Sequence, residues 1–162
     1  MENDKFAVLI VGNQNSGKTA TIKNFQKLHE DNNREILQCR FGWRRINLFF
    51  GKLDALSCLI YFIPSSPTEK NISLENLLKK IMPMDSLPEL FLIAEQLDGK
   101  EYNSTKDFLE KMGYEIKELG INSDKTGGIW EFCSEIDKDK ILTERATEIG
   151  NAFRNYIIKK II

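Results

Sequence analysis

The strongest constraint on this chain lies at residues 12–19, where glycines, a lysine and a threonine fit the pattern G-x-x-x-x-G-K-[ST]. Glycines let the backbone curl so that successive N–H groups point inward at an anion. A helix that follows such a turn offers the same anion its free N–H groups and the positive end of its dipole. The pattern therefore predicts a phosphate-binding loop. The run reads Gly12-Asn13-Gln14-Asn15-Ser16-Gly17-Lys18-Thr19.

The segments on either side of the loop fit this interpretation. Phe6 to Val11 is a continuous apolar run, which is typical of a strand buried on both faces. Lys18 to Glu30 reads as a helix with a partly apolar face. The alternative is a glycine-rich turn without a ligand. A lysine beside a helix N-terminus opposes the helix dipole, however, so the pattern favours a bound anion.

Each part of the loop has an expected role toward a nucleoside triphosphate. The backbone of residues 12–17 would cradle phosphate oxygens. Lys18 would neutralise the outer phosphates during catalysis, and the Thr19 hydroxyl would coordinate Mg²⁺. Thr21, in the helix that follows, is a further candidate for nucleotide binding.

Strands and helices alternate along the rest of the chain. This order predicts one domain over residues 1–162, an α/β/α sandwich of three layers with a mostly parallel sheet. Gly42-Trp43, between two strand-like runs, suggests a hairpin with one antiparallel edge strand. The expected strands are Glu35 to Phe41, Arg44 to Phe50, Cys58 to Ile63, Leu90 to Ala94 and Tyr114 to Leu119. The expected helices are Ser73 to Met82, Ser104 to Met112 and Lys138 to Lys160.

The loop resembles that of Era-like GTPases and of the GTPase domain of ferrous-iron transporters, so the chain looks like a divergent small, Ras-like GTPase among the P-loop proteins. Those loops commonly read Gly-Asn-Pro-Asn-x-Gly-Lys-Ser/Thr, and Gln14 stands here in place of the proline. In potassium-activated members the asparagine that matches Asn15 helps to hold a monovalent cation. Asparagine also suits a tight turn by itself.

Two segments match where such a GTPase reads guanine. The family has Asn-Lys-x-Asp after a buried strand, and here Asp98 alone matches, with Glu95 and Gln96 departing from the pattern. An Asp-Gly turn explains Asp98 equally well. Residues 123–127 resemble the Ser-Ala-Lys-Thr-Gly run below the guanine. The resemblance therefore adds Ser123, Asp124 and Lys125 to the nucleotide-binding candidates.

Other features depart from the small GTPases. The stretch Leu48-Phe49-Phe50-Gly51 lacks the aspartate of their Asp-x-x-Gly motif, and Asp31 to Arg34 contains no switch threonine. An ATPase or kinase instead needs an acid after a buried strand. Glu95 stands at such a place, although a solvated strand-end residue is the alternative.

Three functions therefore remain open at the level of sequence. The first is GTP binding with slow Mg²⁺-dependent hydrolysis, and the second is an ATP-dependent kinase or ATPase that uses Glu95. The third is a non-catalytic nucleotide-binding module that scaffolds a protein partner. GTP is the first choice because of Asp98 and the loop at residues 123–127.

Composition limits the partners and the compartment. The 23 basic and 24 acidic residues give a net charge of -1, which argues against a dedicated nucleic-acid binder. The 3 cysteines lack metal-ligand or redox spacing and fit a reducing compartment. We do not expect the polar start to be a signal peptide, and no apolar run approaches the roughly 20 residues of a membrane span. We therefore expect a cytoplasmic protein.

The remaining charged segments each have a structural interpretation, and some also have a functional one. Arg40, Arg44 and Arg45 surround the expected hairpin turn, where they would guard a sheet edge or stabilise charge in phosphoryl transfer. His29 lies near the end of a helix, where a partly charged imidazole is favourable. The apolar and basic stretch Tyr156 to Ile162 would pack on the sheet, or it would form a partner surface or a weak membrane contact.

Overall fold

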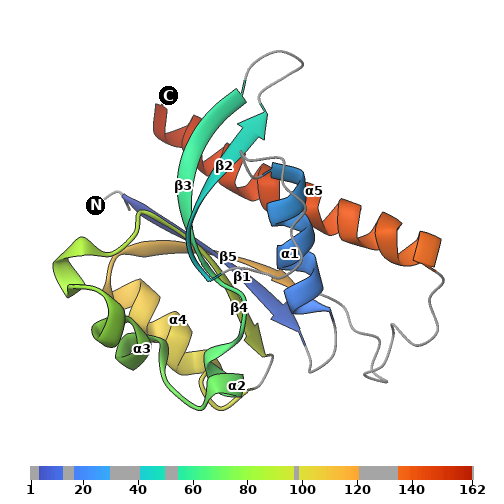
Figure 1. Ribbon diagram of the computed structural model, residues 1–162. Helices are drawn as coiled ribbons and strands as arrows, with labels where there is room; N and C mark the ends of the chain where they lie inside the picture. The colour runs from blue at the N-terminus through green and yellow to red at the C-terminus, as the bar shows by residue number, and fades with distance from the viewer. Residues whose placement is uncertain are drawn as a thin grey trace.

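The computed structural model describes residues 4–12, 17–29, 41–49, 55–96, 99–120 and 135–161. These residues form a five-stranded sheet with helices on both faces (Figure 1). The strands are β1 (Lys5–Gly12), β2 (Gly42–Phe49), β3 (Ala55–Ile63), β4 (Leu90–Gln96) and β5 (Tyr114–Gly120). The helices are α1 (Lys18–His29), α2 (Pro67–Lys70), α3 (Leu74–Ile81), α4 (Tyr102–Lys111) and α5 (Glu135–Ile161), and a 3₁₀ turn spans Met84–Ser86.

The strand order is β2-β3-β4-β1-β5. β1 pairs in parallel with both β4 and β5, and β3 pairs in parallel with β4. Only β2 runs against its neighbour β3, and it lies at one edge of the described sheet. The expectation of an α/β chain with a mostly parallel sheet and one antiparallel edge strand is therefore confirmed.

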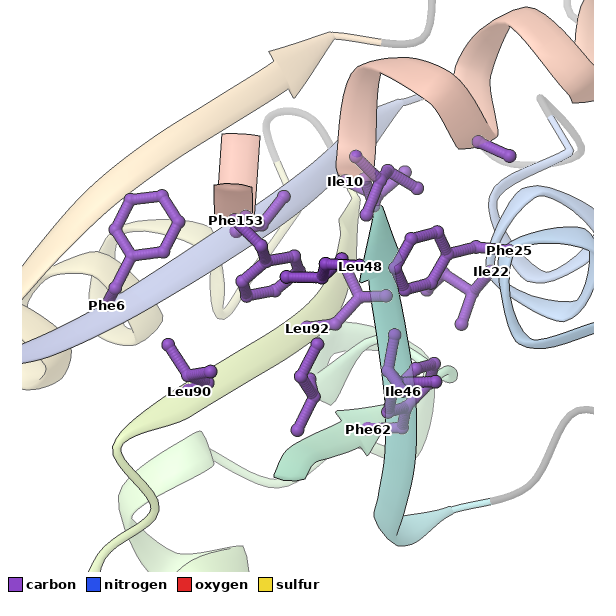
Figure 2. Close-up of a cluster of buried hydrophobic side chains, with 14 of the residues drawn as sticks. Phe6, Ile10, Ile22, Phe25, Ile46, Leu48, Phe62, Leu90, Leu92 and Phe153 are labelled. Carbon is purple, nitrogen blue, oxygen red and sulfur yellow. The ribbon is translucent and has the colours of Figure 1, made fainter. Parts of the chain in front are cut away.

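The central strands are buried on both faces. Ala7 to Ile10 of β1 expose at most 1% of their surface, because helices cover the sheet on each side. On one side α1 and α5 pack over β1, β3 and β4, and Phe25 and Phe153 lie at the centre of that core (Figure 2). On the other side α3 and α4 supply Leu74, Leu78 and Leu109. The apolar run in β1 is thus explained by two cores.

The antiparallel pair does not turn where the sequence suggested. Gly42 and Trp43 lie within β2, where they pair with Phe62 and Tyr61 of β3, so the expected hairpin turn at Gly42-Trp43 is wrong. Gly42 has a φ of 102°, which glycine adopts readily, and in the sequence the glycine itself suggested a turn. Residues 50–54 connect the two paired strands, and the expected strand over 35–41 lies almost wholly outside the described residues.

The helix boundaries follow local signals. Ser73 caps α3, because its Oγ accepts a hydrogen bond from the backbone N–H of Asn76 at 3.1 Å. Gly113 follows α4 with a φ of 88°, the left-handed conformation expected after a helix. The expected helices over Ser73 to Met82 and Ser104 to Met112 correspond to α3 and α4.

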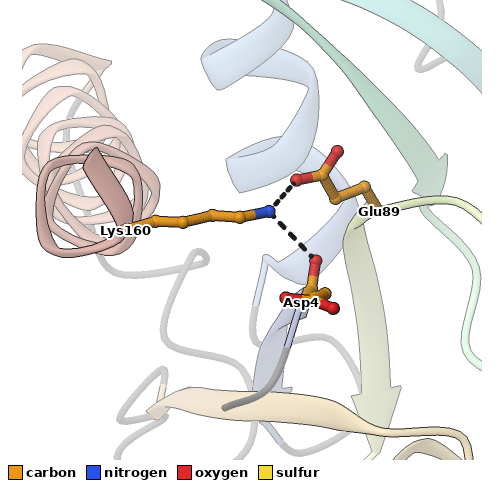
Figure 3. Close-up of polar contacts among 3 residues, drawn as sticks. All are labelled: Asp4, Glu89 and Lys160. Carbon is orange, nitrogen blue, oxygen red and sulfur yellow. Dashed lines mark hydrogen bonds and ion pairs between the residues drawn. The ribbon is translucent and has the colours of Figure 1, made fainter.

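Helix α5 is fixed at its carboxyl end to the amino ends of two strands. Lys160 Nζ lies 2.6 Å from Glu89 Oε1 and donates to the Asp4 carbonyl oxygen at 3.4 Å (Figure 3). The ion pair with Glu89 raises the pKa of Lys160. Asp4 precedes β1 and Glu89 precedes β4, so this contact lies at the amino ends of the two strands. The first turns of α5 therefore lie toward the carboxyl ends of the strands.

Two further findings concern membrane spans and cysteines. None of the helices in the described ranges is long and apolar enough to cross a membrane. Cys58 is a free thiol that packs against the core, and burial raises its pKa to about 11. Cys58 thus behaves as a small hydrophobe, whereas Cys39 and Cys133 lie outside the described residues.

Candidate functional site

The candidate site lies where β1 ends and α1 begins. Gly12 is the last residue of β1, and Gly17 directly precedes α1 with a φ of 89°, a conformation that favours glycine. The neighbouring strand β4 ends beside it, since Val11 pairs with Glu95 and Gly12 with Gln96. Ligands of parallel sheets bind at this carboxyl edge. Residues 13–16 lie outside the described ranges.

Lys18 is buried at the first turn of α1, with only 5% of its surface exposed. Its Nζ donates a hydrogen bond to the Gly12 carbonyl oxygen at 3.1 Å, so the side chain folds back toward the end of β1. Burial lowers the pKa of Lys18, and the carboxylates of Glu69 and Glu95 oppose that shift. A buried ammonium is costly without compensating charge, and an anion at this place would stabilise it.

Thr19 and Thr21 follow Lys18 but point to different surroundings. Thr19 is exposed, and its Oγ1 donates to the Pro64 carbonyl oxygen at 3.2 Å. Thr21 is buried, and its Oγ1 donates to the Gly17 carbonyl oxygen at 2.7 Å. Arg145 of α5 in turn donates to Thr21 Oγ1 at 3.2 Å. Thr21 thus joins α1 to α5.

A cavity of about 530 Å³ opens beside the first turn of α1. Its volume falls within the ordinary range of small-molecule sites. Both cationic and acidic side chains reach it from elements on either side of α1. The described residues that line it are Gly17, Lys18, Thr19, Ala20, Glu69, Lys138 and Leu142.

Glu69 is an acid of this cavity that the sequence reasoning missed. It lies in α2, the short helix that follows β3. Ser66 caps α2, and its Oγ accepts a hydrogen bond from the backbone N–H of Glu69 at 3.1 Å. The signal was present in the sequence, because Ser66-Pro67-Thr68-Glu69 is a typical helix start with proline at the first position.

Glu95 is fully buried, so its interpretation as a solvated strand-end residue is wrong. Its Oε1 accepts hydrogen bonds from Thr68 Oγ1 and from the Gln96 backbone N–H, each at 3.0 Å. Its Oε2 accepts one from Thr105 Oγ1 at 2.7 Å. The carboxylate therefore joins α2, β4 and α4, which is a structural task.

The remaining candidates fall into two groups. Asp98, Ser123, Asp124 and Lys125 lie outside the described residues, as does Arg40. Arg44 and Arg45 lie within β2 rather than at a turn, and Arg45 donates to Ser57 Oγ of β3 at 3.3 Å. Neither arginine is among the described residues of the cavity, so their place fits a charged sheet edge.

His29 lies at the end of α1 as expected, but its charge state differs from the expectation. Its Nδ1 donates to the Asn47 carbonyl oxygen at 3.0 Å. Burial lowers the pKa of His29, with a smaller opposing effect from that hydrogen bond. The imidazole is therefore neutral at pH 7.

The oxygen groups of the cavity suit one divalent cation. No cluster of three or more His, Cys, Asp or Glu side chains that could hold a metal occurs among the described residues. Mg²⁺, however, is commonly held by only one or two protein groups together with substrate phosphates. The Thr19 hydroxyl and the Glu69 carboxylate line the same cavity and are ligands of the right kind.

Comparison with known proteins adds no relative to this description. No model of a known protein family matches the sequence, and no curated protein matches it.

Proposed function

We propose that this chain binds a nucleoside triphosphate with residues 12–19, as a P-loop protein does. The observation that carries the proposal is the buried ammonium of Lys18, placed between the end of β1 and the first turn of α1. A cavity of about 530 Å³ opens at that point. An anion in it would meet the Lys18 side chain and the N-terminus of α1 together.

GTP is the first choice of nucleotide within this proposal, and ATP is the alternative. The preference depends on Asp98 and on the run from Ser123 to Lys125, which resemble the guanine-reading segments of small GTPases. In a GTP-binding chain, Asp98→Ala would weaken binding of GTP and leave binding of ATP unchanged. Equal GTP affinity in that variant would overturn the guanine assignment.

Slow hydrolysis is the second part of the proposal, and Glu69 supports it. Glu69 lines the cavity with Lys18 and Thr19, whereas Glu95 is engaged by three hydrogen-bond donors. In this arrangement Thr19 and Glu69 would hold Mg²⁺, which would screen the charge of the phosphates. Lys18 would stabilise charge on the outer phosphate, and Glu69 would orient a water molecule toward it.

A non-catalytic module that binds a nucleotide and a protein partner is the remaining alternative. The absence of an aspartate from Leu48-Phe49-Phe50-Gly51 favours it, because small GTPases use that residue at the metal. A cytoplasmic location and a single domain over residues 1–162 belong to the same proposal.

Thermal unfolding in the presence of nucleotide tests the proposal. A ligand that binds only the native chain at a hundred times its Kd stabilises it by about 2.7 kcal/mol, which raises Tm by several degrees. We expect this rise with Mg²⁺ and a non-hydrolysable GTP analogue, and a smaller one with the ATP analogue. Lys18→Met should reduce the rise in Tm. Lys27→Ala, which removes the same charge from an exposed part of α1, is the control and should keep it. No rise with either nucleotide would contradict the proposal.

A further inference from the structure

The first turns of α5 form one wall of the cavity. Lys138 and Leu142 both line it and lie on successive turns of the same helix face. Arg145 follows on that face and donates to Thr21 Oγ1 of α1 at 3.2 Å. The hydrogen bond holds this face of α5 against α1 next to the cavity. No residue of α5 was a nucleotide-binding candidate in the sequence.

The wall continues into a part of α5 that packs in the core. Beyond Arg145, α5 buries Ala146, Ile149 and Phe153 in the core that it shares with α1 (Figure 2). Its far end is held by the contact of Lys160 with Glu89 (Figure 3). Side chains near the start of α5 are therefore placed next to the first turn of α1 by described contacts, as a binding site requires.

The charges around the cavity favour an anion. Among the described residues that line it, Lys18 and Lys138 are cations and Glu69 is an acid. Lys138 is half-buried and lies close to the N-terminus of α5, where the helix dipole disfavours a cation. An anion in the cavity would offset the cost of this half-burial and the repulsion by the helix dipole. A lysine ammonium is a common phosphate ligand, because it acts as a mobile point charge.

We propose that α5 completes the nucleotide site, with Lys138 as a second phosphate-binding cation and Leu142 as an apolar contact for the nucleoside. This inference rests on the proposed function and goes beyond it, since residues 12–19 supply only phosphate contacts. Leu142 and Ala20 are the apolar side chains among the described lining residues. Sites for small molecules commonly pair such apolar contacts with a few placed charges.

Calorimetric titration with two ligands tests the two roles separately. The ligands are inorganic tripolyphosphate and the non-hydrolysable nucleotide analogue that the unmodified chain binds, each with Mg²⁺. Lys138→Ala should weaken both by about tenfold, because a charge-assisted hydrogen bond is lost. Leu142→Ser should weaken only the nucleotide, by about tenfold, because tripolyphosphate has no nucleoside.

The matched control is Lys140→Ala, which removes the same charge from an exposed position of the same helix. It should change either affinity by less than about twofold. Thermal unfolding of each variant without ligand checks that the fold is kept. Lys138→Glu provides a second variant, and its loss of affinity should exceed that of Lys138→Ala.

The outcomes separate this inference from the proposed function. If Lys138→Ala behaves like Lys140→Ala while Lys18→Met loses binding, the α5 inference is overturned and the proposed function stands. If Leu142→Ser weakens both ligands equally, Leu142 has no role toward the nucleoside. If the unmodified chain binds neither ligand, both proposals are overturned.

Discussion

Two glutamates close to Lys18 have opposite surroundings, which assigns them different tasks. Glu95 is fully buried, and both of its oxygens accept hydrogen bonds from threonines and a backbone N–H. Glu69 lies at the cavity, on a short helix that a serine caps. Sequence position favoured Glu95, because it directly follows a buried strand. Geometry favours Glu69, because only its carboxylate is among the described groups that line the cavity.

Replacing Glu69 should affect chemistry more than binding. We expect Glu69→Gln to lower the rate of phosphate release from the hydrolysed nucleotide at least about tenfold, because a positioned acid or base contributes 10²–10⁴-fold in typical enzymes. Nucleotide affinity should change less, since glutamine keeps a side-chain oxygen that can face Mg²⁺. Phosphate release under single-turnover conditions measures the rate. Glu110→Gln, on the exposed face of α4, is the control. An unchanged rate in Glu69→Gln would exclude Glu69 from the chemistry.

Replacing Glu95 should instead affect stability. Glu95→Ala leaves the hydroxyl of Thr105 without its acceptor in a fully buried place, and that of Thr68 in a partly buried one. We expect the free energy of unfolding to fall by about 3 kcal/mol. Urea unfolding followed by circular dichroism measures this change. Wild-type stability together with complete loss of hydrolysis would make Glu95 a catalytic residue and refute the structural role.

At the scale of the element, periodicity and helix punctuation predicted most of the fold. Each of these signals depends on only a few neighbouring residues, so it can be read from the sequence. They are the apolar runs in β1 and β4, the serine before α3 and the glycine after α4. The strand order could not be read in this way, because the insertion of β4 between β3 and β1 is a long-range choice.

The two errors at this scale have local causes. The hairpin turn was placed at Gly42 because glycine marks turns and strand irregularities alike. Helix α2 was overlooked because it is only 4 residues long, although its capping signal was visible. At the candidate site, spacing predicted the loop at residues 12–19, and its role stays a prediction. Glu69 and Lys138 were not predicted, because they approach the loop from elements distant in sequence.

The glycine after α4 provides a test of the signal that ends this helix. Gly113 has a φ of 88°, and a side chain there would face open space, so strain alone decides the effect of a substitution. We expect Gly113→Ala to lower the free energy of unfolding by about 1 kcal/mol. Gly120→Ala is the control, because Gly120 has no positive φ and also faces open space. Equal stability of the two variants in urea unfolding would refute the account of this helix end.

At the scale of the whole molecule, the single histidine gives the stability a defined pH dependence. The pKa of His29 lies below its ordinary value of 6.5 in the folded chain, chiefly because of burial. The unfolded chain therefore takes up a proton first as pH falls below about 6.5, and the free energy of unfolding decreases from there to the folded pKa. Well above pH 6.5 both states are neutral at this group, and stability does not depend on it.

Urea unfolding at pH 7.5 and pH 5.5 measures this dependence. We expect a lower free energy of unfolding at pH 5.5 than at pH 7.5. The difference between the two pH values should be smaller in His29→Gln, since the sequence contains no other histidine. A difference of the same size in both proteins would show that other groups cause it.

The central claim is that Lys18 and the loop before α1 bind the phosphates of a nucleoside triphosphate. The most direct test is calorimetric titration of the chain and of Lys18→Met with non-hydrolysable GTP and ATP analogues in Mg²⁺. Methionine keeps the aliphatic stem of the buried side chain and removes only its charge. The account predicts saturable binding that weakens at least about tenfold in the variant. Equal affinity of both proteins, or no binding by the unmodified chain, would contradict it.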